Sequence, residues 1–259
     1  MIFIVILIII YIMEYKFIKA CKIGDFKEAK KIYTKNKYTK NMLNIHAEND
    51  RAFRFACKNG HIEIAKWLIS FEDIPNITND ITFGIVCENG QIEIAKWLMT
   101  LENKPNIHAV NDYAFKFACK NGHIEIAKWL MTLEDKPNIH AKNDFAFRKA
   151  CYNGELEVAQ WLYELEDKPN IHAENDFAFR YACLWGYIEI AKWLYGLNDN
   201  PNIRADNDFA FMYACKWKRI ELVKWLVNLC DDYHIEIEDG KIKSWKIHNN
   251  LQKLYDKMI

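Results

Sequence analysis

The sequence repeats itself with a period of 32 residues over most of its length, as the spacing of Cys119, Cys151, Cys183 and Cys215 shows. The clearest unit, residues 106–137, reads NIHAVNDYAFKFACKNGHIEIAKWLMTLEDKP. A second series marks the same period: Trp67, Trp97, Trp129, Trp161, Trp193 and Trp225. A fixed period of this length predicts a stack of supersecondary units that share one continuous core.

Each unit is predicted to hold two helices. Asn111 and Asp112 are expected to cap a first helix over YAFKFACK by accepting its free backbone N–H groups, and Gly122 supplies the left-handed residue that ends it. A second helix follows in HIEIAKWLMTL, and Pro137 cannot continue it. Most side chains of the second helix are apolar, so we expect it to be buried between neighbours. The unit is therefore predicted to be helix–turn–helix–loop.

The period also predicts the organisation of the chain. Residues 44–230 hold six repeats, with boundaries at 44–75, 76–105, 106–137, 138–169, 170–201 and 202–230. Residues 14–43 match a degraded unit with a more polar second helix, which predicts an N-terminal capping repeat. Residues 231–259 are predicted to be a C-terminal cap. Alternation of apolar and polar residues on both sides of Asp239-Gly240 indicates a hairpin there, and residues 244–259 are expected to add a short helix.

Residues 1–13, MIFIVILIIIYIM, carry no charged side chain. As a helix they would be about 20 Å long, against a bilayer hydrocarbon core of about 30 Å. Three interpretations remain open. The segment is an extension upstream of a protein that starts at Met13, a weak membrane anchor, or an additional packing element.

Composition narrows the choice of partner and compartment. Lys+Arg and Asp+Glu both number 35, so no net field attracts nucleic acid or anionic lipid. Six of the eight cysteines share one repeat position. Equivalent atoms of neighbouring helical units lie roughly 8–10 Å apart, beyond the Cα separation of about 7 Å that a disulfide tolerates. The cysteines are therefore predicted to be small core residues in a reducing environment.

Residues 122–130, GHIEIAKWL, match the Gly-His-Leu-Glu-Val-Val-Lys-Leu-Leu stretch of the ankyrin repeat almost position by position. Ala118-Cys119 stand at the Ala-Ala pair of that family, and residues 106–109 resemble the Val-Asn-Ala strand of its finger loop. The Thr-Pro-Leu-His motif of the family is replaced by YAFK at residues 113–116, so aromatic packing is expected in place of its Thr–His hydrogen bond. The resemblance implies an all-α, ankyrin-type helical repeat solenoid with short finger loops and a concave face. A tetratricopeptide unit fits less well, because it would be 34 residues long without such a loop.

The repeated pattern Asn-Asp-x-Ala-Phe-x-x-Ala-Cys is similar to that of ankyrin proteins found in large families in giant DNA viruses of amoebae. This resemblance implies a non-enzymatic scaffold that binds another protein through its concave face and finger loops. It also implies an intracellular setting, the cytoplasm of an infected host cell. A membrane-tethered adaptor anchored by residues 1–13 is the alternative, and binding of nucleic acid is disfavoured by the zero net charge.

Candidate binding residues lie on the first helix of each unit. Positions 113, 116, 117 and 120, with their equivalents, form a stripe along the first helix that lies opposite the Ala/Phe/Ala/Cys face. The residues of this stripe differ between copies. Basic and aromatic residues, which are frequent at interface hot spots, prevail there. One hypothesis is a basic ladder for an acidic protein segment, formed by Arg54, Lys116, Arg148 and Arg180, with Tyr152 and Tyr181 on the same stripe. The alternative is a solvated face whose aromatic residues pack between repeats.

The last two copies differ from the others at the turn between their helices. Asn-Gly-His becomes Trp185-Gly186-Tyr187 in one and Trp217-Lys218-Arg219 in the other. Large aromatic residues on adjacent turns predict an apolar interaction patch, unless they pack under the C-terminal cap with Trp245. Lys218 is expected to adopt the left-handed conformation of the missing glycine, with a strain of about 1 kcal/mol.

No metal, cofactor or enzymatic activity is predicted. His46, His108, His140 and His172 share a loop position, and side chains repeated at helix spacing cannot converge on one ion. We expect them to make structural hydrogen bonds in the fingers. The sequence has no Gly-rich phosphate loop, nucleophile elbow or His-Glu-x-x-His motif.

Overall fold

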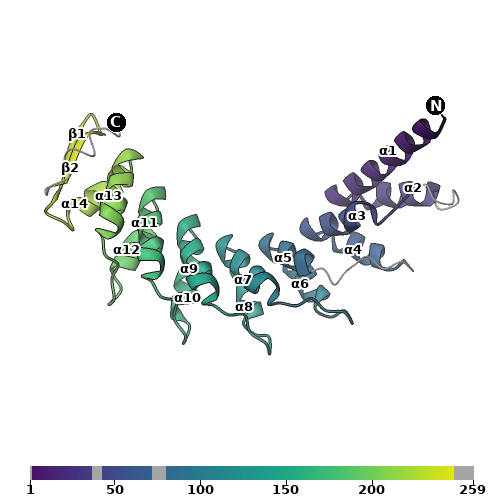
Figure 1. Cartoon of the computed structure of the whole chain (residues 1–259), viewed down its shortest axis with the longest axis horizontal. Coiled ribbons are helices and arrows are strands. Elements are labelled where there is room, and N and C mark those ends of the chain that lie inside the picture. The colour runs from purple at the N-terminus through teal and green to yellow at the C-terminus, as the bar shows by residue number, and fades with distance from the viewer. Residues whose placement is uncertain (1, 37–42, 72–79, 248–259) are drawn as a thin grey trace. The chain divides into compact units, whose positions relative to one another are not determined.

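The computed structural model describes residues 2–36, 43–71 and 80–247 (Figure 1). Within these residues, 14 helices follow one another in pairs and a two-stranded sheet comes last. The chain forms two compact units, Met1–Asn138 and Ile139–Ile259, which are described separately below.

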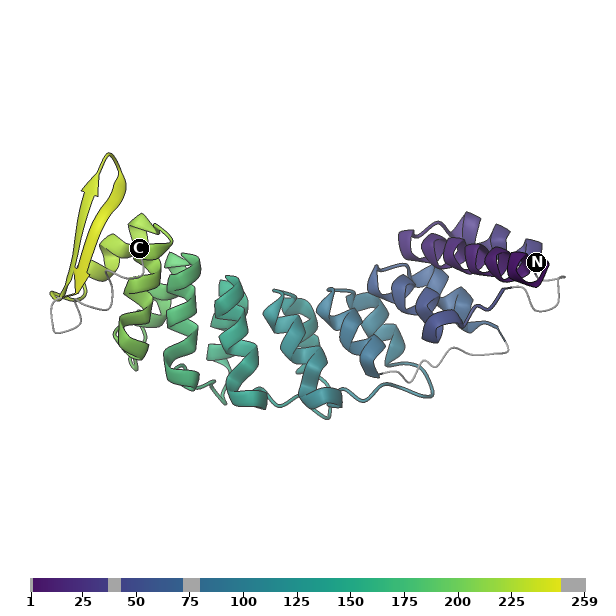
Figure 2. The ribbon, with the colours of Figure 1, turned by 45° about the horizontal axis from the view of Figure 1, so that its top comes forward.

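Unit 1 contains four helix pairs. They are α1 (Ile2–Ile23) with α2 (Phe26–Asn36), α3 (Ala47–Lys58) with α4 (Ile62–Ile69), α5 (Asp80–Glu88) with α6 (Ile92–Leu98), and α7 (Ala109–Lys120) with α8 (Ile124–Leu130). Within unit 1 the first helix of each pair packs on its second helix, and α1, α3, α5 and α7 pack on one another in that order (Figure 2). We call these two sets the first helices and the second helices.

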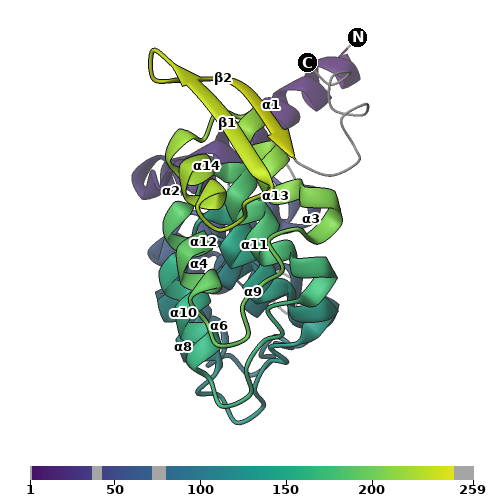
Figure 3. The same cartoon turned by 90° about the vertical axis from the view of Figure 1, so that its left-hand side faces the viewer.

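Unit 2 contains three helix pairs and the sheet. They are α9 (Ala141–Asn153) with α10 (Leu156–Glu164), α11 (Ala173–Trp185) with α12 (Ile188–Tyr195), α13 (Ala205–Lys216) with α14 (Ile220–Val227), and the strands β1 (Tyr233–Glu238) and β2 (Lys241–Ile247). The first helices α9, α11 and α13 stack in order, and β1 contacts α14 at the end of the unit (Figure 3). The predicted helix–turn–helix–loop unit is confirmed.

The core of each pair follows the spacing of its small and aromatic residues. Ala178, Phe179, Ala182 and Cys183 fall on one face of α11, and all four are 0% exposed. The half-buried Trp225 of the second helix α14 packs against this face of α11. The ring of Trp225 lies 6.3 Å from that of Phe179, within the range of favourable aromatic pairs.

The cysteine series lies in this core. The helical cysteines are all free and buried: Cys21, Cys57, Cys87, Cys119, Cys151, Cys183 and Cys215. Burial raises the pKa of the Cys119 and Cys151 thiols, which keeps them protonated and unreactive. The prediction that these cysteines are core residues is confirmed.

α1 continues without a break through residue 14, where the sequence suggested a boundary. Its second half is held in unit 1 by Phe17 and Cys21, which are 1% and 0% exposed. Residues 2–13 therefore extend the first helix of the predicted capping repeat. Among the helices that the structure describes, none is both long and apolar enough to cross a membrane. Residues 37–42 and 76–79, at the end of the predicted capping repeat and the start of the repeat at 76–105, lie outside the described residues.

The C-terminal hairpin is confirmed. β1 and β2 pair antiparallel from Tyr233 opposite Ile247 to Glu238 opposite Lys241, with an irregularity after Glu236. The connecting Asp239 and Gly240 have φ of 50° and 71°, the left-handed pair that a tight hairpin turn requires. The helix expected from residue 244 is wrong for residues 244–247, which belong to β2, because these residues pair with residues 233–236 of β1. Residues 248–259 lie outside the part of the chain that the structure describes.

Lys218 adopts the predicted left-handed conformation, with φ of 55°. At the equivalent Gly154 two constraints act. Its φ is 89°, and a Cβ there would lie 2.8 Å from Cε1 of Tyr187, which comes from the next pair. No helix pair follows α14 within the described residues, so a side chain at position 218 meets no such neighbour. At Lys218 only the strain of the left-handed backbone remains.

We therefore expect Lys218→Gly to raise the free energy of unfolding by about 1 kcal/mol. Urea unfolding followed by circular dichroism measures this change. Gly154→Ala is the matched control and should lower stability by at least as much, because it adds both strain and a clash. A Lys218→Gly protein that is no more stable than the wild type would contradict this account.

Candidate functional site

The finger loops enter the first helices through three consecutive residues with left-handed backbone. At the start of α11, after Ala173, these are Glu174, Asn175 and Asp176, with φ of 55°, 61° and 56°. The same conformation recurs at residues 48–50, 110–112, 142–144 and 206–208. Left-handed backbone costs roughly 1–2 kcal/mol for each non-glycine residue, so surrounding contacts must hold these turns. The expectation that Asn111 and Asp112 cap an ordinary helix start is wrong, because both residues belong to such a turn.

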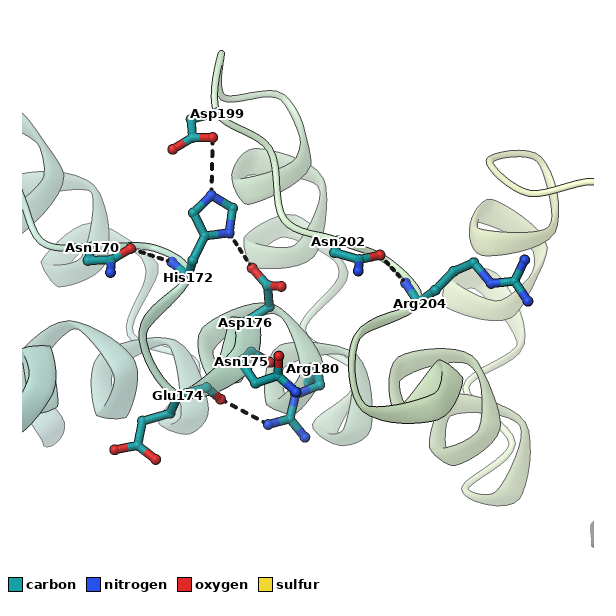
Figure 4. A network of polar contacts seen from close by, with 9 residues as sticks. All are labelled: Asn170, His172, Glu174, Asn175, Asp176, Arg180, Asp199, Asn202 and Arg204. Atoms are coloured by element: carbon teal, nitrogen blue, oxygen red, sulfur yellow. Dashed lines mark hydrogen bonds and ion pairs between the residues drawn. The ribbon is translucent and has the colours of Figure 1, made fainter.

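Histidine holds one side of the turn in four of these five fingers. Asn170 Oδ1 accepts a 2.9 Å hydrogen bond from the backbone N–H of His172, and His172 Nδ1 lies 2.6 Å from Asp176 Oδ1 (Figure 4). His172 Nε2 is 3.1 Å from a carboxylate oxygen of Asp199, in the loop that follows α12. The imidazole thus ties one finger to the next.

The same arrangement recurs in other fingers. His108 lies between Asp112 and Asp135, and His140 lies between Asp144 and Asp167. His46 pairs with Asp50 in the first finger. The prediction that the loop histidines make structural hydrogen bonds is confirmed. Within the described ranges, no group of three or more His, Cys, Asp or Glu side chains is arranged to hold a metal ion.

In the last finger Arg204 takes the place of histidine. Its Nε donates to Asp208 Oδ1 at 3.0 Å and its Nη1 to Asp232 Oδ2 at 2.5 Å. Tyr233 of β1 donates to the same Asp208 oxygen at 2.7 Å. Burial and the Asp208 carboxylate raise the pKa of the Tyr233 phenol, so this group stays protonated as a donor. These contacts attach the hairpin to the last finger.

Arginine holds the other side of the turn. Arg180 donates from Nη2 to the carbonyl of Glu174 at 3.0 Å (Figure 4) and from Nε to that of Asn175 at 2.7 Å. Its Nη1 donates to Asp206 Oδ2 at 2.5 Å. Arg148 makes the two equivalent carbonyl contacts, at 2.6 Å and 3.0 Å. Burial lowers the pKa of Arg148 from its ordinary value, and Glu174 opposes this change.

The basic ladder therefore does not face outward as expected. Lys116 is 2% exposed, and Arg148 and Arg180 are each 7% exposed. Because the regular part of these helices begins only after the left-handed turn, the side chains of Arg148 and Arg180 fold back over their own finger. Arg54 donates to the carbonyls of Asn49 and Glu48 in the same way, but it remains partly exposed.

The aromatic residues of the stripe do come together in unit 2. We call the following set the aromatic surface: Tyr152, Phe177, Tyr181, Trp185, Phe209 and Tyr213. Phe177 stacks on Tyr181 at 4.1 Å, Tyr181 lies 5.3 Å from Phe209, and Tyr152 lies 5.7 Å from Trp185. The rings thus form one connected set over α9, α11 and α13. The sequence reasoning missed Phe209 and Tyr213, although they occupy the stripe positions of Phe177 and Tyr181.

Two indole rings remain open to solvent. Trp185 is 41% exposed, and Trp217, at the end of α13, is 55% exposed. The cap residue Trp245 packs instead on Phe211, with the ring centroids 6.0 Å apart. The alternative that Trp217 is buried under the cap is therefore wrong. Tyr187 is only partly exposed, because its ring covers the turn at Gly154.

Cations accompany the aromatic rings. The Lys149 ammonium lies 4.5 Å from the ring centroids of both Tyr152 and Phe177, and that of Lys216 lies 5.6 Å from the ring of Tyr213. Arg180 packs its guanidinium 5.0 Å from the ring of Phe209. The surface of these three first helices is therefore aromatic and locally basic.

The finger histidines predict how stability depends on pH. Partial burial alone would lower the pKa of His172, but the carboxylates of Asp176 and Asp199 outweigh it and raise the pKa above its ordinary 6.5. The pKa of His108 is raised against the same burial effect, and that of His140 is raised chiefly by Asp167. The stabilisation that these protonated histidines give the folded state is therefore complete below their unfolded-state pKa. It is lost as the pH rises through their folded-state pKa values.

We expect the free energy of unfolding to fall as the pH rises from the ordinary histidine pKa of 6.5 through the raised folded-state values, as measured by urea titrations at several pH values. The triple variant His108→Arg, His140→Arg and His172→Arg is the control, since Arg204 fills this position naturally and does not titrate there. Its stability should not change over this range. Equal slopes for the two proteins would show that these histidines do not cause the pH dependence.

Comparison with known proteins identifies the repeat. A family model described as "Ankyrin repeats (3 copies)" matches residues 83–175, 116–205 and 149–239. These matches together cover residues 83–239, more than half of the 259 residues. No curated protein sequence matches the chain. The paired helices, the finger loops and this match show that the chain belongs to the ankyrin-repeat family.

Proposed function

We propose that the chain is a non-enzymatic scaffold that binds another protein through the aromatic surface of unit 2 together with Tyr187 and Trp217. Ankyrin repeats are typically protein–protein interaction scaffolds and are generally non-catalytic. The observation that carries the proposal is the exposure of Trp185 and Trp217, 41% and 55%, beside a connected set of aromatic rings. Large exposed apolar groups of this kind mark interaction surfaces.

The chemistry of the surface indicates what it would bind. Tyr and Trp rings offer a large contact area with few rotatable bonds, which makes them frequent hot-spot residues. Lys149 and Lys216 beside the rings favour a segment that carries both apolar side chains and carboxylates. Tyr152, Tyr181, Trp185, Tyr187 and Trp217 are the residues that we propose contact the partner.

The basic residues of the stripe take a different part in this proposal. Lys116, Arg148 and Arg180 are buried, so their proposed contribution is to hold the fingers in the shape that the partner meets. Arg54 is more exposed and remains a candidate contact residue of unit 1. The cytoplasm of a virus-infected cell as the setting rests on the similarity of the repeat to viral ankyrin variants.

The test is quantitative affinity capture from a cell extract with the wild type and with Trp185→Ser, Trp217→Ser. We expect the captured partner to be lost from the double variant, because its two most exposed aromatic anchors are gone. Ile237→Ser is the control, since Ile237 is also in unit 2 and is 40% exposed, but lies on the hairpin. Circular dichroism should show the same helix content in all three proteins. Capture that is equal for the wild type and the double variant would overturn the proposal.

A further inference from the structure

The N-terminal half of α1 exposes an unusual amount of apolar surface. Between 41% and 66% of each of these side chains is exposed: Ile4, Val5, Ile6, Leu7, Ile8, Ile9, Tyr11 and Ile12. α1 has 22 residues and its partner α2 has 11, so α2 covers only the second half of α1 (Figure 1). The first half continues past α2.

Exposed apolar side chains lie on every side of this part of α1. Residues 4–9 are six consecutive residues that are all exposed, and 3.6 residues complete one turn. A neighbouring helix would cover one face and leave the opposite side chains in water. An apolar solvent covers every side at once. This distribution favours lipid over a second copy of the chain as the occupant.

The length of the apolar segment agrees with a single leaflet. Residues 2–13 carry no charge, and at 1.5 Å per residue they extend about 18 Å. One leaflet contributes about half of a hydrocarbon core of roughly 30 Å. Beyond the first turn, the backbone of a helix satisfies its own polar groups, as insertion requires.

Polar groups then follow in the order of a membrane interface. Tyr11 and Tyr15 are exposed at the end of the apolar segment, and aromatic rings of this kind are frequent at the interface. Beyond them lie the exposed lysines of α1 and α2: Lys16, Lys19, Lys22, Lys27, Lys30, Lys31 and Lys35. The acidic residues of α1, α2 and the turn between them are fewer: Glu14, Asp25 and Glu28. The chain as a whole has no net charge, but this end is basic and complements anionic headgroups.

We infer that the N-terminal half of α1 inserts into one leaflet of a membrane that contains anionic lipid. Tyr11 and Tyr15 lie at the interface, and Lys16 and Lys19 contact the headgroups. This inference is independent of the aromatic surface in unit 2. It would place the protein on a membrane surface, with its repeats in the adjoining water.

Flotation of the full chain with lipid vesicles tests the inference. We expect the wild type to float with vesicles of phosphatidylcholine and phosphatidylserine, and less with phosphatidylcholine alone. Ile4→Glu should reduce binding about tenfold or more, because it places a charge in the hydrocarbon. Ile23→Glu is the matched control, since both isoleucines are 62% exposed on the same helix, and its binding should be unchanged. Lys16→Glu with Lys19→Glu should remove the preference for anionic vesicles.

Three results would overturn the inference. The first is a wild type that stays at the bottom of the gradient with both kinds of vesicle. The second is equal loss of binding in Ile4→Glu and Ile23→Glu. The third is a lipid-free dimer in sedimentation velocity that Ile4→Glu dissociates, since a second copy would then cover the segment.

Discussion

Arg180→Met is expected to lower the free energy of unfolding by about 3 kcal/mol. The substitution keeps the apolar stem but removes the donors to the carbonyls of Glu174 and Asn175 and to Asp206. Hydrogen bonds from a charged group each contribute roughly 1.5–3 kcal/mol, and the left-handed turn would lose the contacts that offset its strain. Urea unfolding followed by circular dichroism measures the change.

Arg54→Met is the matched control for this prediction. Arg54 makes the same two carbonyl contacts, but water reaches it and can replace the lost donors. We expect a loss of at most about 1 kcal/mol there. Arg180→Lys should fall between the two, because an ammonium group cannot form the same fork of contacts. Equal losses for Arg180→Met and Arg54→Met would show that the buried guanidinium does not stabilise the turn.

Phe179→Ala is expected to lower the free energy of unfolding by about 3–5 kcal/mol, the usual loss for a buried phenylalanine. Phe179 is 0% exposed and contacts the ring of Trp225 in α14. Its loss opens a cavity between successive helix pairs. Because a repeat protein is coupled mainly through neighbouring repeats, we also expect the unfolding curve to broaden or to split into two steps.

Phe177→Ala, two residues earlier on the same helix, is the control. The ring of Phe177 belongs to the aromatic surface and stacks on Tyr181, so solvent and neighbouring rings can fill its place. Its loss should cost about 1 kcal/mol or less and leave a single transition. If the two variants were equally unstable, the division between the core face and the exposed face of α11 would be incorrect.

Much of the fold could be predicted from the sequence because it depends on interactions between residues close in the chain, and the same interactions recur in every repeat. Apolar spacing places Phe179 and Cys183 on one helix face wherever the helix lies. The pair Asp239-Gly240 favours a hairpin turn through its own backbone preference, and Lys218 stands where a left-handed residue is required. The extent of β2 was harder to predict, because the pairing of Trp245 with Ile235 depends on a second strand.

The candidate site was predicted only in part. Helical periodicity placed Arg148 and Arg180 opposite the core face, where solvent would be expected. The left-handed turn at the start of each of these helices lets the arginines reach their own finger carbonyls instead. A run of three left-handed residues without glycine cannot be read from residue preferences, since contacts with side chains outside the run must offset its strain. In three fingers these contacts come from a histidine on one side and an arginine on the other.

The sequence by itself determined the repeating helix pairs, the family and the cysteine-lined core, because each follows from the period and from the spacing of apolar residues. Only the tertiary structure decided which polar side chains are exposed. It buried Lys116, Arg148 and Arg180, and it left Trp185 and Trp217 in solvent. The physical reason is that exposure depends on what neighbouring loops and repeats cover, and that coverage is set by contacts between residues distant in the chain.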